Sequence, residues 1–89
     1  LKIDGQFIRD LVTDPLNAAA VRCFIEVAQV RGLQTVAEFV DSQPVLQRLC
    51  QMGVNWAQGY LLHRPAPLDE VFQAAAAAAQ LPTARASNV

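Results

Sequence analysis

The alternation of short apolar runs with longer helical patterns is the feature that most constrains this chain. Runs typical of buried strands lie at residues 1–4, 34–40 and 54–58, and the second is rich in β-branched and aromatic residues. A helical pattern follows each run. Strands that alternate with helices over short connections favour parallel βαβ units with right-handed crossovers. The sequence therefore predicts an α/β chain of three strand–helix units with parallel strands.

Capping residues give the boundaries of the first two helices. Asp14 can accept hydrogen bonds from the first turn of a helix that starts with proline, and Gly32 can adopt the left-handed conformation that ends it. These signals predict a helix at 15–31. The same reasoning predicts a second helix at 43–52, between a serine and a glycine.

The C-terminal part of the chain is rich in proline and alanine. The prolines in segment 64–67 are expected to prevent a regular element there. A third helix is predicted to begin at Leu68 and to run through the alanine-rich stretch until Pro82 blocks it. We therefore divide the chain into a folded part, residues 1–81, and a flexible tail, residues 82–89.

The composition indicates a globular chain, because 53% of the residues are hydrophobic and 17% are charged. The net charge of −1 gives no support to binding the phosphate backbone of a nucleic-acid polymer. A small phosphodiester ligand is still compatible with this charge, because bound metal ions can supply the positive charge that it needs. No apolar run reaches the roughly 18 residues that a membrane span needs. We expect neither a nucleic-acid polymer nor a membrane as a partner of this segment.

The two cysteines, Cys23 and Cys50, fit neither the spacing of a metal-binding knuckle nor that of a redox CxxC pair. Both fall in predicted helices among apolar neighbours. We therefore expect buried free thiols in a reducing compartment, which is a cytoplasmic location. The chain opens at Leu1 without an initiator methionine or a signal-peptide pattern, and we expect it to be a segment of a longer protein.

Polar side chains stand near the ends of the three predicted strands, where parallel α/β folds carry their chemistry. The first strand offers Lys2 and Asp4, the second Glu38 and Asp41, and the third Gln58. Plain alternatives exist: a solvated lysine at a chain end, an aspartate–glycine turn and a hydrogen-bonded amide at a strand end. Glu38 is harder to explain this way, because a carboxylate in an apolar strand costs several kcal/mol unless it is paired or coordinated. The agreement in position predicts a site at this edge of the sheet.

Three segments of the chain resemble the characteristic segments of EAL domains. They are Leu1–Gly5 with Phe7–Asp10 ("LKIDxxFV"), Thr35–Val40 ("TVAEGVE" or "AEFVE"), and Asn55–Leu61 with Arg64–Pro65 ("D-x-x-QGYxxxRP"). Their order is that of the family, and so are the separations of 36 residues from Lys2 to Glu38 and 20 from Glu38 to Gln58. The resemblance covers roughly residues 1–72.

The resemblance implies a fold and an activity. EAL domains are modified TIM-like barrels of about 240–250 residues, within the usual range of (β/α)8 barrels. They hydrolyse one phosphodiester bond of cyclic di-GMP to give the linear dinucleotide, and they use Mg²⁺ or Mn²⁺. By this resemblance the chain is the C-terminal third of such a barrel and supplies its last three strand–helix units.

The resemblance also implies roles for single residues. Lys2 matches the active-site lysine near the attacking water and the phosphate, and Glu38 matches a glutamate of the water and metal shell that has been considered as a general base. Gln58 and Asp41 fall at substrate-binding positions. Two residues depart from the pattern, since Phe39 stands where glycine is commoner and Asp41 is one methylene shorter than the usual glutamate.

The family's metal-binding residues belong to segments upstream of those matched here, so the resemblance implies no metal site in this segment and no hydrolysis by it alone. Three interpretations follow: part of a phosphodiesterase, a degenerate domain that binds cyclic di-GMP as a receptor, or a protein-interaction module.

Three strands covered by helices on one side would leave one face and two edges of the sheet open. We therefore expect self-association or pairing with the upstream half of the barrel.

Overall fold

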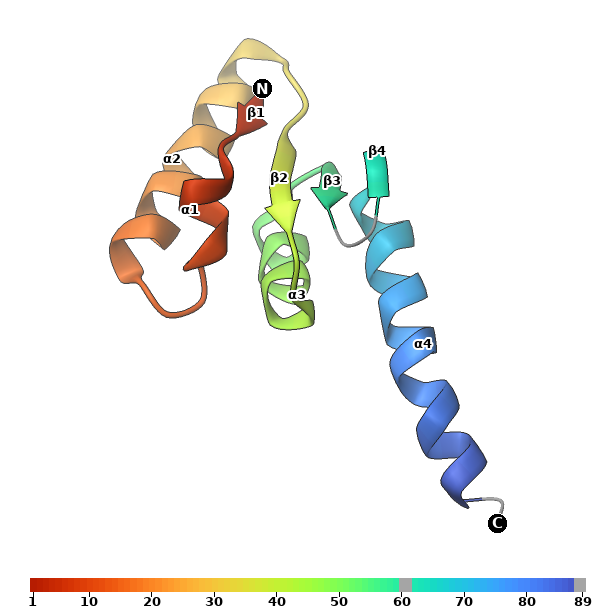
Figure 1. Ribbon diagram of the computed structural model, residues 1–89. Helices are drawn as coiled ribbons and strands as arrows, with labels where there is room; N and C mark the ends of the chain where they lie inside the picture. The colour runs from red at the N-terminus through yellow and green to blue at the C-terminus, as the bar shows by residue number, and fades with distance from the viewer. Residues whose placement is uncertain (60–61, 88–89) are drawn as a thin grey trace.

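A computed structural model describes residues 1–59 and 62–87 of the 89-residue chain. The elements, in chain order, are β1 Lys2–Ile3, α1 Gly5–Arg9, α2 Pro15–Arg31, β2 Val36–Val40, α3 Gln43–Met52, β3 Trp56–Gly59, β4 Leu62–Pro67 and α4 Leu68–Ser87. Figure 1 shows the four strands side by side, with α2 at one side of the molecule and α4 at the other. The predicted succession of strands and helices is confirmed, and α2 and α3 have the predicted bounds.

The strands form one sheet in the order β1-β2-β3-β4, in which β1, β2 and β3 are parallel. This arrangement confirms the three predicted parallel units. Lys2 pairs with Val36 and Ile3 with Ala37 across β1 and β2, and β3 continues the same register with Trp56 opposite Val36. Since paired residues point to the same side of a sheet, this register decides which side chains share a face.

β4 was not predicted. It pairs with β3 in the antiparallel direction, with Trp56 opposite Pro67 and Ala57 opposite Ala66. The expectation that residues 64–67 form no regular element was wrong, because proline is tolerated on an edge strand, where its missing N–H is not needed by a neighbour. β4 occupies the outer edge of the sheet.

α4 also differs from the prediction, because the helix continues past Pro82 to Ser87. Proline removes one hydrogen bond from a helix interior, and the strong helix propensity of the preceding alanines offsets that local loss. The end predicted at Pro82 was therefore wrong for this helix. Mobility of residues 82–89 stays a prediction, and residues 88 and 89 lie outside the described part of the chain.

The core lies between the sheet and its helices. Ile3, Ala37 and Ala57 point to this side and are at most 1% exposed. The helical side chains packed with them in one buried cluster include Val21 and Ile25 of α2, Leu46 and Leu49 of α3, and Leu68 and Val71 of α4. The opposite side of the sheet is much more open: Lys2 is exposed, and Val36 and Trp56 are half-buried.

The cysteines are free thiols, as predicted, but their predicted burial was wrong. Cys23 is exposed and Cys50 is half-buried. The reason is the geometry of α2, whose buried stripe is formed by Ala18, Val21, Ile25 and Ala28. At 100° per residue, Cys23 points away from that stripe.

Candidate active site

The site predicted from the strand ends lies on the sheet face opposite the buried core that the helices cover. Because side chains alternate along a strand, Lys2, Val36 and Trp56 share this face, with Glu38 and Gln58 one step further along β2 and β3. In a (β/α)8 barrel the helices lie outside, so a face without helices is the barrel interior.

A bulge brings Glu38 close to Gln58. Ala37 pairs with Ala57 and Val40 pairs with Gly59, so two residues of β2, Glu38 and Phe39, stand opposite the single residue Gln58 of β3. Ala37 and Val40 are both fully buried on the helix side, which fixes the extra residue between them. Bulges of this kind redirect side chains beside active sites.

Glu38, Phe39, Gln58 and Gly59 line one hollow of about 130 Å³ at this end of the sheet. Two of the predicted site residues, Glu38 and Gln58, are thus brought together, each half-buried. The hollow combines a carboxylate, an amide and an aromatic ring, a combination able to accept a proton, donate hydrogen bonds and contact a flat ligand.

Backbone geometry at the bulge leaves little freedom. Phe39 has a left-handed φ of 57°, which is uncommon for a bulky residue and costs on the order of 1–3 kcal/mol. Gly59 has φ 111°, and a Cβ there would lie 2.6 Å from the carbonyl oxygen of Val40. Only glycine allows the two strands to approach this closely. The strained phenylalanine and the required glycine both line the hollow.

Lys2 reaches the same face from β1. Its strand partner is Val36, so Glu38 is its diagonal neighbour, with Cα atoms about 8 Å apart by ideal strand geometry. Lys2 lies within β1, two residues before Asp4. Asp4, directly after β1, corresponds in position to Glu38 of β2. Its carboxylate accepts a hydrogen bond from the Gln6 N–H at 2.9 Å and caps α1. Local capping therefore accounts for Asp4.

Comparison with known proteins identifies the family to which this chain belongs. The sequence profile of the EAL domain matches residues 1–65. The chain belongs to the EAL domain family.

Several curated relatives of the chain are named cyclic di-GMP phosphodiesterases. The chain is 44% identical over 68 residues to the cyclic di-GMP phosphodiesterase PdeB of Shewanella oneidensis, a stretch that covers 76% of this chain and 8% of that protein. It is 46% identical over 70 residues to the probable cyclic di-GMP phosphodiesterase PdeA of Escherichia coli, covering 79% of this chain and 10% of that protein. The chain thus spans about a tenth of the length of these relatives.

Solved EAL structures share the fold. The PaMucR phosphodiesterase in complex with c-di-GMP superposes with a TM-score of 0.66 at 37% identity, covering 80% of this chain and 29% of that one. The EAL domain of Mycobacterium smegmatis DcpA gives the same TM-score and identity, covering 82% of this chain and 33% of that one. The chain therefore forms strand–helix units of an EAL barrel and leaves the larger part of that barrel unaccounted for.

Asp41 does not line the hollow formed by Glu38, Phe39, Gln58 and Gly59. It follows β2 directly and is exposed, whereas the hollow is lined by residues 38, 39, 58 and 59. Its predicted contact with substrate stays a prediction. Tyr60 and Leu61 of the third EAL segment lie outside the described residues.

The acidic residues of this EAL segment do not form a metal site. Among the side chains that the structure describes, those of residues 1–59 and 64–78, no three His, Cys, Asp or Glu gather closely enough to hold an ion. Glu38 is the only carboxylate among the side chains lining the hollow of about 130 Å³. The donor set on these strands therefore does not fit a divalent metal by itself.

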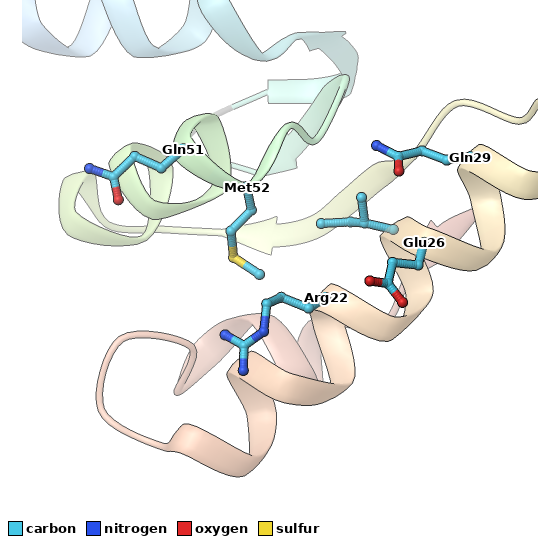
Figure 2. Close-up of a pocket in the computed structure, with 6 residues that line it drawn as sticks. Arg22, Glu26, Gln29, Gln51 and Met52 are labelled. Atoms are coloured by element: carbon cyan, nitrogen blue, oxygen red, sulfur yellow. The ribbon is translucent and has the colours of Figure 1, made fainter.

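A larger hollow, of about 320 Å³, lies on the helix side of the sheet. It is lined by Arg22, Glu26 and Gln29 of α2 and by Gln51 and Met52 of α3, and Figure 2 shows Met52 pointing toward α2. Its lining does not include Lys2, Glu38 or Gln58. In the described part of the chain, no helix is both long enough and apolar enough to span a membrane.

Sequence reasoning missed two members of the site. Phe39 was noted only as a departure from glycine, and Gly59 only as part of the segment Asn55–Leu61. The available signal was the glycine that EAL domains commonly carry at the position of Phe39. A left-handed φ there gives the physical reason for that preference.

Proposed function

We propose that this chain is the C-terminal third of an EAL barrel that hydrolyses cyclic di-GMP to the linear dinucleotide, and that Lys2, Glu38 and Gln58 face the scissile phosphodiester. The observation that carries the proposal is the shared hollow of Glu38 and Gln58 on the uncovered face of the sheet. Its place at the carboxyl ends of parallel strands is where barrel enzymes act.

Each residue has a distinct role in this proposal. The Lys2 ammonium stabilises negative charge that builds on the phosphate oxygens as water attacks. Glu38 accepts the proton of that water, a role that suits a half-buried carboxylate within reach of the ligand. The Gln58 amide donates hydrogen bonds that orient the dinucleotide. The phosphodiesterase names of the relatives and the c-di-GMP complex of a structural neighbour support this substrate.

The proposal includes a divalent cation, Mg²⁺ or Mn²⁺, held by residues upstream of these three units. Within the described residues the acidic side chains lie too far apart to hold such an ion together, so its ligands are assigned to the rest of the barrel. The chain alone is then an incomplete enzyme.

The sheet edges support pairing with an upstream barrel segment at β1. β4 closes one edge, and its Pro65 and Pro67 lack the N–H donors that another strand would need. β1 forms the other edge and carries no proline. A further parallel strand is therefore accommodated on the β1 side, where a barrel requires it. We further propose a cytoplasmic location, the compartment in which two free thiols persist.

The incompleteness of the chain can be tested directly. The purified 89-residue chain is incubated with cyclic di-GMP and either Mg²⁺ or Mn²⁺, and the linear dinucleotide is measured by chromatography. We expect no product above the level of a sample in which Glu38 is replaced by Gln. Steady turnover by the unsubstituted chain would show that these units carry a complete site.

A further inference from the structure

Two neighbouring hollows on the helix side of the sheet form one furrow between α2 and α3. The hollow of about 320 Å³ lies next to a second one, of about 250 Å³, because Gln51 lines both. The rest of the second hollow is lined by Val12, Pro44, Gln47 and Arg48. The two hollows together are called the α2–α3 furrow below.

The remainder of an EAL barrel would leave the α2–α3 furrow at the surface. α2 and α3 follow β1 and β2, which are neighbours in the sheet. In a (β/α)8 barrel the helices that follow neighbouring strands are also neighbours in the outer ring, so the groove between them faces outward. The furrow therefore differs from the β1 edge and from the sheet face of Glu38 and Gln58, which the proposed barrel uses.

Both hollows contain apolar side chains. Val12 and Pro44 contribute to the smaller hollow, and Ile25 and Met52 contribute to the larger one. Ile25 is only 6% exposed and so lies at the base, while Met52 points toward α2 (Figure 2). The α3 residues that line the two hollows are centred about four positions apart, or about 6 Å along the helix. Alternate side chains of an extended peptide are about 6–7 Å apart, so two of them match the two hollows.

Charged side chains follow a fixed order along the furrow. α2 and α3 both run back from the carboxyl end of the sheet, because the strands before them are parallel. The smaller hollow lies at that end, since Pro44 belongs to the first turn of α3. Arg48 therefore comes first, Arg22 second, and Glu26 third, one turn further along α2. All three are exposed, and Figure 2 shows the Arg22 guanidinium turned away from the Glu26 carboxylate.

We infer that the α2–α3 furrow is a docking site for an extended segment of a partner protein with the residue order acidic, apolar, acidic, apolar, basic. Its two apolar side chains enter the two hollows. Its acidic side chains lie beside Arg48 and Arg22, and its basic side chain lies beside Glu26. Pockets for alternate side chains give specificity to extended peptides, and complementary charges fix their register.

The amide side chains of the furrow favour a peptide over a nucleic acid. Gln29, Gln47 and Gln51 line the two hollows, and each amide both donates and accepts hydrogen bonds. A peptide backbone needs both, because it presents N–H and C=O groups. A phosphate backbone is negatively charged throughout, so Glu26 would repel it. Arginine and methionine, both present here, are enriched in protein–protein interfaces.

The probe is the capped peptide acetyl-Glu-Leu-Glu-Leu-Lys-amide, titrated into the ¹⁵N-labelled 89-residue chain and followed by NMR. We expect saturable shifts of the backbone amide signals of residues 22–29 and 45–52, and no comparable shifts at residues 36–38. Replacing both leucines of the peptide by alanine should weaken binding at least about tenfold, because the apolar contacts in the hollows are lost.

A rearranged peptide, acetyl-Glu-Leu-Lys-Leu-Glu-amide, tests the charge order. It has the same composition and net charge, but its cation lies between the two acids whichever way the chain runs. We expect it to bind at least about fivefold more weakly, because the lysine falls beside Arg22 and one glutamate falls beside an end of the furrow that does not match it.

Charge reversal on the protein tests single contacts. Arg48→Glu should weaken binding of the first peptide about fivefold, and acetyl-Lys-Leu-Glu-Leu-Lys-amide should bind this variant more tightly than it binds the parent chain. Arg31→Glu is the matched control, because it makes the same charge change in the last turn of α2, outside both hollows. It should weaken binding less than about twofold. Both arginines are exposed, so the fold is retained, as circular dichroism verifies.

The inference fails if the first and the rearranged peptides bind equally, because that result would indicate attraction to charge alone. It fails equally if millimolar peptide produces no shifts, if the shifts map to residues 36–38 instead, or if Arg48→Glu binds as the parent does. None of these readouts uses cyclic di-GMP. Failure here therefore leaves the proposed activity untouched, and loss of that activity leaves this docking site untouched.

Discussion

Gly59 shows how one residue sets the spacing of the site. Its φ is 111°, and a Cβ added there would lie 2.6 Å from the Val40 carbonyl oxygen, so the backbone leaves no room for a side chain. Gly59→Ala should lower the free energy of unfolding by about 3 kcal/mol or more, the sum of backbone strain and overpacking. Urea denaturation followed by circular dichroism measures this loss.

Gly32→Ala is the matched control for Gly59→Ala. Gly32 also has a positive φ, 70°, but a Cβ there would meet nothing within 4 Å. The substitution should cost only about 1–2 kcal/mol, the penalty of the left-handed conformation. Equal losses at the two glycines would mean that close approach of β2 and β3 is not what Gly59 provides.

Gly5 and Phe39 are predicted to be energetically coupled. A Cβ on Gly5 would fall within 2.9 Å of three side-chain atoms of Phe39, including Cβ and Cγ. Gly5→Ala should therefore destabilise the chain, although alanine is the better helix former at the start of α1. In a Phe39→Gly background the same change should be neutral or stabilising, because the obstacle is gone.

A double-mutant cycle of Gly5→Ala and Phe39→Gly measures that coupling. We expect an interaction free energy of about 1–3 kcal/mol from urea denaturation of the four chains. Additive effects would contradict the packing of the Phe39 ring against Gly5.

At the scale of elements, Asn55 holds β2 and β3 in register at the amino end of the sheet. Its Oδ1 accepts from the Thr35 N–H at 2.9 Å and from Thr35 Oγ1 at 3.2 Å, and its own N–H donates to Thr35 Oγ1 at 3.3 Å. Thr35 is 2% exposed, so water cannot readily replace these bonds.

Asn55→Ala should lower the free energy of unfolding by about 1–3 kcal/mol, because two buried donors of Thr35 lose their acceptor. Asn55→Asp keeps an oxygen at the same place and should retain most of the stability. Thermal or urea unfolding compares the two. If Asn55→Asp is as destabilising as Asn55→Ala, the acceptor oxygen is not the contribution that matters.

The elements also show what the sequence could predict. α2 and α3 have the predicted bounds because local signals fix them: Asp14 accepts the Leu16 N–H, and Ser42 accepts the Val45 N–H. β4 and the end of α4 depend on context, since proline stops an element only where its N–H or its space is needed. The exposure of Cys23 follows from the direction of a helix face, which an apolar neighbourhood in sequence does not reveal.

The candidate site was predictable in part for the same reason. Strand ends alone placed Lys2, Glu38 and Gln58 at one edge of the sheet, and the register puts them on one face. The bulge that sets Glu38 and Phe39 opposite Gln58 arises from pairing between distant segments. Such pairing leaves no local signature except an occasional preference for glycine.

At the scale of the whole molecule, we assign this chain to one part of an EAL barrel and the metal ligands to another part. The similarity of residues 1–65 to the EAL domain, with only about a tenth of the curated relatives covered, supports that division. β1 forms one edge of the described sheet and carries no proline, so it leaves room for a further parallel strand of the barrel.

The most direct measurement of this claim is hydrolysis of cyclic di-GMP by a chimera, in which residues 1–72 replace the matching segment of the Shewanella phosphodiesterase. We expect linear dinucleotide from the chimera, a loss of at least about 100-fold with Glu38→Gln, and no loss with Glu70→Gln, an exposed glutamate of α4. A Glu38→Gln chimera as active as the unsubstituted one would contradict the account, and a chimera that binds cyclic di-GMP without cleaving it would indicate a receptor.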